Sequence, residues 1–172
     1  MAAPEAAPAA HADPVGRDSA TAMGRLFSET CFRHAGDAAG LRAELVPPRF
    51  TPMPDSVSRA VLPRPGQAFA VPGAPGHLMV LSFDDGWCGT GGTGIEPAAL
   101  TNSLSERVRA AGGGEMKLMG ADQAGREQRY LIDRPHGTPV ALLVLLMPEP
   151  GGSPLMQASL FASDMKNGDA AP

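Results

Sequence analysis

Residues 77–94 read HLMVLSFDDGWCGTGGTG, and this stretch decides the fold because it joins an apolar strand to a glycine-rich segment that contains a cysteine. Residues 77–83 are almost entirely apolar, which predicts a strand in the middle of a sheet. Cys88 follows in a segment, residues 84–95, that we expect to be a mobile glycine-rich loop. The chain has one other cysteine, Cys31, so one intramolecular disulfide is possible.

Cys31 lies on the apolar face of a predicted N-terminal helix. Asp18 or Ser19 is a suitable N-cap and Gly36 a suitable stop for this helix. Its apolar face, with residues three and four apart, is formed by Ala22, Met23, Leu26, Phe27 and Cys31. A disulfide between Cys31 and Cys88 would tie this helical arm to the sheet, and closing a loop of about 58 residues would stabilise the fold by roughly 4 kcal/mol.

A disulfide would also indicate an oxidising compartment, which here means a periplasmic or secreted location. Residues 1–15, MAAPEAAPAAHADPV, have neither a basic start nor an apolar core, so they are not an intact secretory signal. Ala10-His11-Ala12 resembles a cleavage site, as expected near the start of a mature exported protein. The alternative is a cytoplasmic protein in which both cysteines are buried free thiols.

Turn signals and periodicity predict the remaining elements. A short helix over 38–46 ends at Pro47-Pro48, and residues 47–66, rich in proline, form a long covering loop. Helices are expected over 18–36, 38–46 and 97–111, and strands over 67–71, 77–83, 115–119, 128–133, 140–147 and 155–162.

This order predicts an α+β fold: an antiparallel sheet of five to six strands, helices packed on one face, and an N-terminal helical arm. We expect one domain over residues 18–164, with a disordered Ala/Pro-rich tail over 1–17 and a flexible tail over 165–172. The middle part, two strands, a helix and a meander, is similar in element order to profilin-like and PAS-like folds, which mostly bind ligands or partners.

Composition excludes two classes of partner. The net charge is −4 and no run of Lys or Arg occurs, which argues against nucleic-acid binding. The longest apolar run, residues 140–147, is far shorter than the roughly 20 residues of a membrane-spanning helix.

Residues 84–94 contain the candidate ligand or partner loop. Its members are Asp84, Asp85, Trp87, Gly89, Gly91 and Gly94. The glycines match G-x-G-x-x-G, but two acidic residues come before them and no alternating strands and helices follow, so no nucleotide cofactor is expected. Asp84 and Asp85 lack a third local carboxylate, so we expect a turn in which they accept hydrogen bonds from backbone amides rather than a metal site.

No catalytic residue is assigned. Cys88 would need a base or a helix N-terminus to form a thiolate, and the sequence places neither beside it. His11, His34, His77 and His136 show no metal-ligand spacing, and no nucleophile elbow is present.

An outline of tail, cysteine-bearing helix, proline-rich stretch, strand, Gly86-Trp87-Cys88, helix and meander resembles small exported proteins of proteobacteria. The resemblance covers about residues 19–163 and depends on Cys31 and Cys88. It is consistent with a periplasmic location and implies no activity.

The sequence therefore predicts a non-enzymatic exported module that acts as an accessory subunit or binds a small molecule or another protein. The alternative is a small cysteine- or histidine-dependent hydrolase or transferase that uses loop 84–94.

Overall fold

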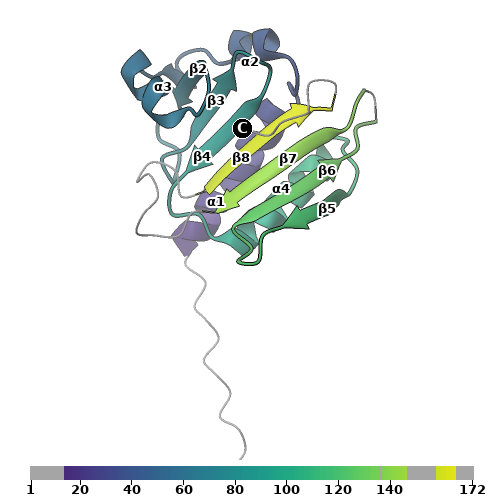
Figure 1. Ribbon diagram of the computed structural model, residues 1–172. Coiled ribbons are helices and arrows are strands. Elements are labelled where there is room, and N and C mark those ends of the chain that lie inside the picture. Colours follow the sequence, from purple (N-terminus) through teal and green to yellow (C-terminus); the bar gives the residue numbers. More distant parts are fainter. Residues whose placement is uncertain (1–13, 136, 147–157, 166–172) are drawn as a thin grey trace, which may run out of the picture.

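An antiparallel sheet of eight strands organises the part of the chain that the structure describes. The computed structural model describes residues 14–135, 137–146 and 158–165. The strands are ordered β1-β2-β3-β4-β8-β7-β6-β5 across the sheet (Figure 1). The elements are α1 (Pro14–Phe27), the π-helical turn η1 (Ser28–Phe32), α2 (Ala38–Glu44), β1 (Thr51–Pro52), α3 (Asp55–Val61), β2 (Gly66–Ala70), β3 (Met79–Phe83), β4 (Cys88–Gly92), α4 (Pro97–Ala110), β5 (Met116–Ala121), β6 (Glu127–Ile132), β7 (Val140–Leu146) and β8 (Ala158–Asp164).

The α+β class predicted from the sequence is confirmed, but the sheet has eight strands instead of five or six. The two additional strands are β1 and β4. β4 is central, because it pairs with β3 on one side and β8 on the other. β4 was not predicted because three of its five residues are glycine, which has a low strand propensity.

One face of the sheet is covered by α1, η1, α2 and α4, and we call it the helix face. Alternate strand residues such as Val80, Leu142 and Leu160 point to this face and are buried against the helices. Figure 1 shows α1 and α4 behind the sheet. This layer holds the larger hydrophobic core.

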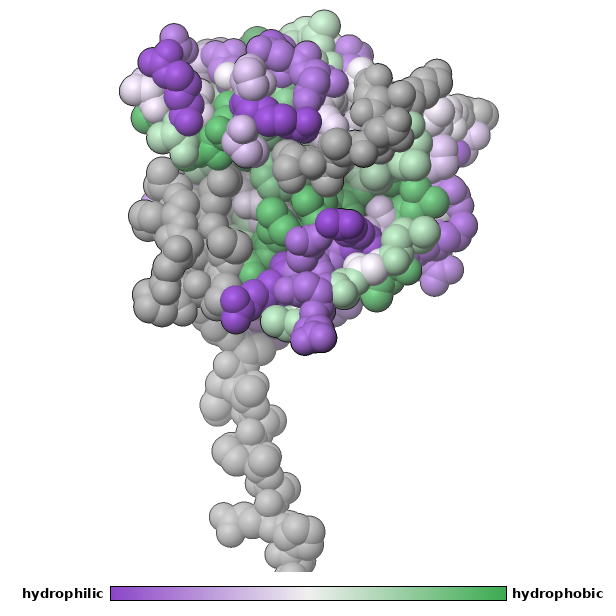
Figure 2. Space-filling model, viewed as in Figure 1, coloured by the Kyte–Doolittle hydropathy of each residue, from purple (hydrophilic) through white to green (hydrophobic). Residues whose placement is uncertain are grey.

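The opposite face carries Trp87, and we call it the Trp87 face. Met79, Leu81 and Phe83 of β3 form a second apolar cluster there with Phe161 of β8. Val61 of α3 packs into this cluster, so the helices are not confined to one face as predicted. Figure 2 shows hydrophobic residues over the middle of this face and hydrophilic residues over the end near α2 and α3.

The N-terminal helix begins earlier than predicted, at Pro14 instead of Asp18 or Ser19. Residues 14–17 of the expected tail therefore belong to α1, while residues 1–13 and 166–172 of the expected tails lie outside the described residues. After α1 the chain continues in the π-helical turn, where the Thr30 hydroxyl donates to the Leu26 carbonyl over 2.6 Å. Gly36, with φ of +84°, ends this segment as predicted.

The predicted disulfide between Cys31 and Cys88 is present, with a Cα–Cα distance of 5.2 Å. Cys31 belongs to η1 and Cys88 is the first residue of β4. Both side chains are buried on the helix face. The bond therefore ties the N-terminal helical arm to the centre of the sheet.

Residues 47–66 are not a simple covering loop. They contain edge strand β1, the helix α3 and the first residue of β2. Pro54 fixes the extended backbone before α3, and Ser58 of that helix accepts a hydrogen bond from Ala68 N over 3.1 Å. This bond and the packing of Val61 hold α3 against β2.

Candidate functional site

The turn between β3 and β4 holds three of the residues predicted for the candidate loop. Phe83 N donates to the Trp87 carbonyl over 3.0 Å, which closes a tight hairpin, and Gly86 adopts φ of +93° within it. The Asp85 carboxylate accepts from Trp87 N over 3.2 Å. For Asp85, the prediction of a carboxylate that accepts from a backbone amide is confirmed.

Asp84 is held by an arginine that is distant in sequence. Arg42 Nη2 lies 2.7 Å from Asp84 Oδ1 and 3.0 Å from the Ser82 carbonyl, while Arg42 Nε donates to Ser82 Oγ over 2.9 Å. The guanidinium thus bridges the end of β3 and the start of the turn. It fixes one carboxylate oxygen of an otherwise exposed aspartate.

Arg64, in the segment between α3 and β2, contacts the same turn. Its Nη1 lies 2.8 Å from Asp85 Oδ2, and its guanidinium carbon lies 5.5 Å and 5.6 Å from the ring centroids of Phe83 and Trp87. A cation at this distance from aromatic faces is attracted by the ring quadrupoles. Arg64 Nε and Nη2 are buried and have no hydrogen-bond acceptor, so this cation is only partly satisfied.

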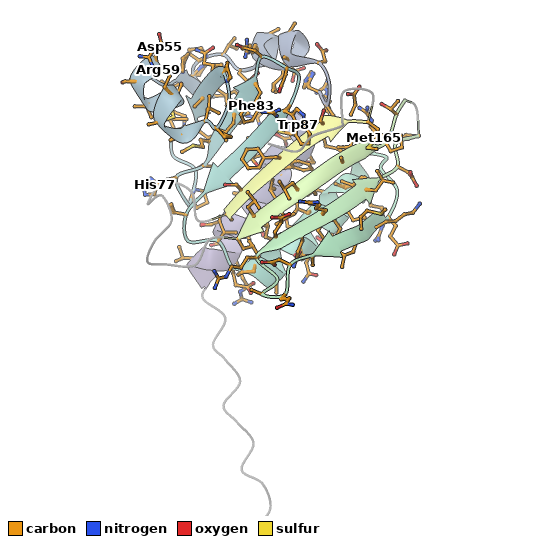
Figure 3. All side chains as sticks on the ribbon, viewed as in Figure 1. Asp55, Arg59, His77, Phe83, Trp87 and Met165 are labelled. Carbon is orange, nitrogen blue, oxygen red and sulfur yellow. A yellow bond between two sulfur atoms is a disulfide. The ribbon has the colours of Figure 1, made fainter. Side chains whose placement is uncertain are left out.

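A cavity of about 460 Å³ lies between α3, the segment that follows it and Asp84. Its lining residues are Asp55, Ser58, Arg59, Leu62, Pro63, Arg64, Pro65, Gly66 and Asp84. The volume lies within the range of about 300–1,000 Å³ that is usual for small-molecule sites. Pro63 and Pro65 restrict the backbone on both sides of Arg64, so this wall is stiff. Figure 3 shows Asp55 and Arg59 on α3, with Phe83 and Trp87 nearer the middle of the sheet.

The structure separates the glycines from the rest of the predicted loop. Gly89 and Gly91 are buried residues of β4, paired with Leu81 and Met79 of β3. Gly94 is exposed beyond the strand, with φ of +60°. A phosphate-binding loop needs free backbone amides at a helix N-terminus, whereas the backbone here pairs with two neighbouring strands. The expectation of a mobile loop over 84–95 was therefore wrong for β4.

Cys88 has no free thiol, because its sulfur is bonded to Cys31. Its side chain is 1% exposed. A thiolate nucleophile must be both ionised and accessible to a substrate, and this state of Cys88 meets neither condition.

No hydrogen bond or ion pair joins either described histidine to the turn. His77 precedes β3, at the end of that strand opposite to Trp87 (Figure 3). His34 follows η1 and pairs with Glu44; His11 and His136 are outside the described residues. Among the residues that the structure describes, no three His, Cys, Asp or Glu side chains gather as a metal ion would require.

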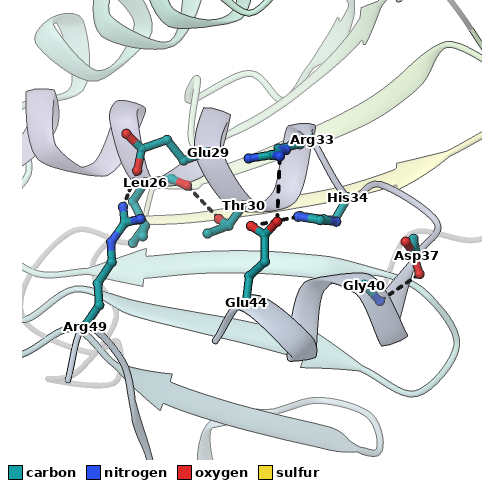
Figure 4. Close-up of polar contacts among 9 residues, drawn as sticks. All are labelled: Leu26, Glu29, Thr30, Arg33, His34, Asp37, Gly40, Glu44 and Arg49. Atoms are coloured by element: carbon teal, nitrogen blue, oxygen red, sulfur yellow. Dashed lines mark hydrogen bonds and ion pairs between the residues drawn. The ribbon is translucent and has the colours of Figure 1, made fainter. Parts of the chain in front are cut away.

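His34 belongs to a group of polar and ionisable side chains that joins η1 and α2 (Figure 4). Its Nε2 lies 3.1 Å from Glu44 Oε2, Arg33 Nη2 lies 3.8 Å from Glu44 Oε1, and Arg49 pairs with Glu29. The close contact with His34 lowers the pKa of Glu44 below its ordinary value of 4.5. Slight burial acts in the opposite direction, and the nearby positive charges add to the lowering.

Sequence reasoning indicated the turn but missed its arginines. Arg42 and Arg64 lie in segments interpreted only as a short helix and a covering loop, and their partners Asp84 and Asp85 are far away in sequence. The one local signal was Arg64 itself, a cation held between two prolines.

No protein-family model, curated protein or solved structure matches this chain. Within the described ranges, none of the helices has the length and apolar character needed to cross a membrane.

Proposed function

We propose that this protein is an exported, non-enzymatic binding module that holds a small ligand in the cavity between α3 and the β3–β4 turn. The cavity is the observation that carries the proposal. It is concave, of suitable volume, and lined by charged groups of both signs on a wall stiffened by prolines. We favour a small molecule over a protein partner because the volume of the cavity is that of a small-molecule site.

The turn adds preorganisation to the proposed site. Asp84 and Asp85 are each held by an arginine, and Trp87 is buried beneath Arg64. Side chains fixed before binding lose little conformational entropy when a ligand arrives. A rigid arrangement of this kind suits recognition.

The disulfide supports the proposed location outside the cytoplasm, because disulfides persist mainly in oxidising compartments. Cell fractionation of the native host tests this part of the proposal. We expect the protein in the periplasmic or secreted fraction, and recovery from the cytoplasmic fraction would contradict an exported location.

The alternative of a hydrolase or transferase has less support. Its cysteine version needs a free Cys88 thiol, which the disulfide removes. Its histidine version needs an imidazole that serves the turn. Of the histidines that the structure describes, His34 is paired with Glu44, and His77 lies at the opposite end of β3 from Trp87 (Figure 3).

A ligand screen tests the proposed function. Mixtures of amino acids, short peptides, sugars and nucleotides are added to isotope-labelled protein, and backbone amide shifts are followed by NMR. We expect shifts concentrated in residues 55–66 and 84–87.

A blocking variant and a matched control make the screen decisive. Arg59→Trp places a bulky ring at the cavity wall and should abolish binding, whereas Arg109→Trp, at an exposed position on α4, should not. The proposal is overturned if no mixture binds, or if the ligand shifts residues elsewhere and binds Arg59→Trp normally.

A further inference from the structure

The charges around the cavity indicate the chemical class of its ligand, an inference that rests on the proposed function. Arg59 and Arg64 supply positive charge to the wall, and Asp55 and Asp84 supply negative charge. Arg64 is paired with Asp85 and Asp84 with Arg42. Arg59 and Asp55, in contrast, have no charged partner among the described side chains. The charge that remains for a ligand is therefore one cation and one carboxylate, with a further oxygen of Asp84.

Arg59 is the accessible cation of the cavity. It is exposed, and no hydrogen bond or ion pair joins it to another side chain of the described residues. Arg64 is the inner cation, whose Nη1 is engaged by Asp85 while Nε and Nη2 have no acceptor. Because Nε and Nη2 of Arg64 are buried, the exposed guanidinium of Arg59 is the one suited to a ligand carboxylate, which can accept two of its N–H groups at once.

The negative groups lie on two different elements. Asp55 is the first residue of α3, is exposed, and has no partner among the described side chains. Asp84 gives Oδ1 to Arg42, and no described group is bonded to its other carboxylate oxygen. An ammonium group with three N–H donors could use these free oxygens.

A ligand with one sign of charge fits this wall poorly. A simple anion would be attracted to the arginines but repelled by the two aspartates. A simple cation would be attracted to the aspartates but repelled by the arginines. A ligand with separated charges of both signs satisfies both groups. Leu62 and Pro63 also line the cavity and offer apolar surface to the part of the ligand between its charged groups.

We propose that the cavity binds a zwitterionic short peptide. Its terminal carboxylate contacts Arg59, on the side of the cavity where Arg64 lies, and its terminal ammonium contacts Asp55 and Asp84. Arg59 makes the direct contact with the carboxylate, and Arg64 contributes positive charge behind it. The peptide is recognised chiefly by its two charged ends, so the identity of its side chains has less effect on its affinity.

Calorimetric titration with dialanine and three blocked forms tests this proposal. The blocked forms are N-acetyl-dialanine, dialanine amide and N-acetyl-dialanine amide. We expect dialanine to bind, each single block to weaken binding by about tenfold, and the double block to abolish it.

Variants assign the two ends. Arg59→Gln should weaken dialanine binding by about tenfold and remove the preference for the free carboxylate, while Asp55→Asn should remove the preference for the free amine. Arg109→Gln is the matched control and should behave like the wild-type protein. Unchanged thermal unfolding midpoints of the variants show that the fold is retained.

The outcomes separate this inference from the proposed function. If blocked and free dialanine bind equally well, or if dialanine fails while another ligand shifts residues 55–66, the zwitterion inference is overturned and the binding module stands. If no ligand of any class binds, both are overturned.

Discussion

Gly89 lies where β4 passes against the ring of Phe161, and no side chain fits at this position. A Cβ atom on Gly89 would lie 2.9 Å from Phe161 Cδ1 and 3.2 Å from the Leu160 carbonyl oxygen. Both neighbours belong to β8, the strand paired with β4. The glycine that resembled part of a phosphate loop is required by close packing in the sheet.

We therefore expect Gly89→Ala to lower the free energy of unfolding by about 1–3 kcal/mol, because the added methyl group overpacks the interior. Gly120→Ala is the matched control, since Gly120 also lies in a strand but has nothing within 4 Å of the added atom. Urea unfolding measures both variants. Equal stability of the two would contradict the account of β4.

Glu44 gives the structure a contribution to stability that depends on pH. Because its folded-state pKa is lowered, the carboxylate stabilises the fold above its ordinary value of 4.5. This contribution disappears as the pH falls through the lowered pKa. The Glu44 and Arg33 side chains are largely exposed, so the effect is small, under about 1 kcal/mol.

The variant Glu44→Gln should accordingly be less stable than the wild type at about pH 5.5, and the difference should shrink at about pH 3. Chemical unfolding at the two pH values gives the comparison. A difference that stays constant or grows on acidification would show that the pair with His34 does not stabilise the folded state.

Among the elements, α1 and α4 pack closely through small residues. A Cβ atom on Gly24 of α1 would lie 2.8 Å from the Cβ of Ser103 on α4. Alanine normally favours a helix over glycine by about 1 kcal/mol. The close contact between the helices should reverse that preference here. Glycine at position 24 therefore allows α4 to lie close to α1 on the helix face.

Gly24→Ala should therefore destabilise the protein by about 1–3 kcal/mol despite its better helix propensity. In Gly24→Ala/Ser103→Gly the removed side chain makes room, so the double variant should lose less stability than the sum of the single changes. Ser105→Gly, elsewhere on α4, should be additive with Gly24→Ala. Additive losses in both pairs would contradict the close contact.

The elements that the sequence predicted are those with a clear local pattern. Amphipathic spacing identified α1 and α4, and alternation between turn signals identified β5, β6 and β7 to within about two residues. Three elements, β1, β4 and α3, were missed. β4 is rich in glycine, and the prolines around β1 and α3 made residues 47–66 resemble a loop. At the site, Asp85 and Trp87 were identifiable from one stretch of chain, but Arg42 and Arg64 reach the turn only through tertiary folding.

For the whole molecule, the Cys31–Cys88 bond connects the N-terminal helical layer to the sheet at a buried point. The cysteines are 57 residues apart in sequence. Closing a loop of that length lowers the entropy of the unfolded chain and corresponds to about 4 kcal/mol. This is a large share of the 5–15 kcal/mol by which a typical domain is stable.

Reduction should therefore lower the free energy of unfolding by about 4 kcal/mol, measured by urea unfolding with and without reductant. The variant Cys31→Ala/Cys88→Ala should be similarly destabilised and should not respond to reductant. Equal stability of the oxidised and reduced wild-type protein would mean that the bond adds nothing to the fold.

Cys88 is part of a structural cross-link, so the proposed binding module has no catalytic thiol while the bond is intact. Thiol titration tests this claim most directly, with native and denatured protein, each before and after reduction. We expect no reactive thiol in the unreduced protein, whether it is native or denatured. After reduction, the denatured protein should have two reactive thiols. A thiol that reacts rapidly in the native, unreduced protein would contradict this claim.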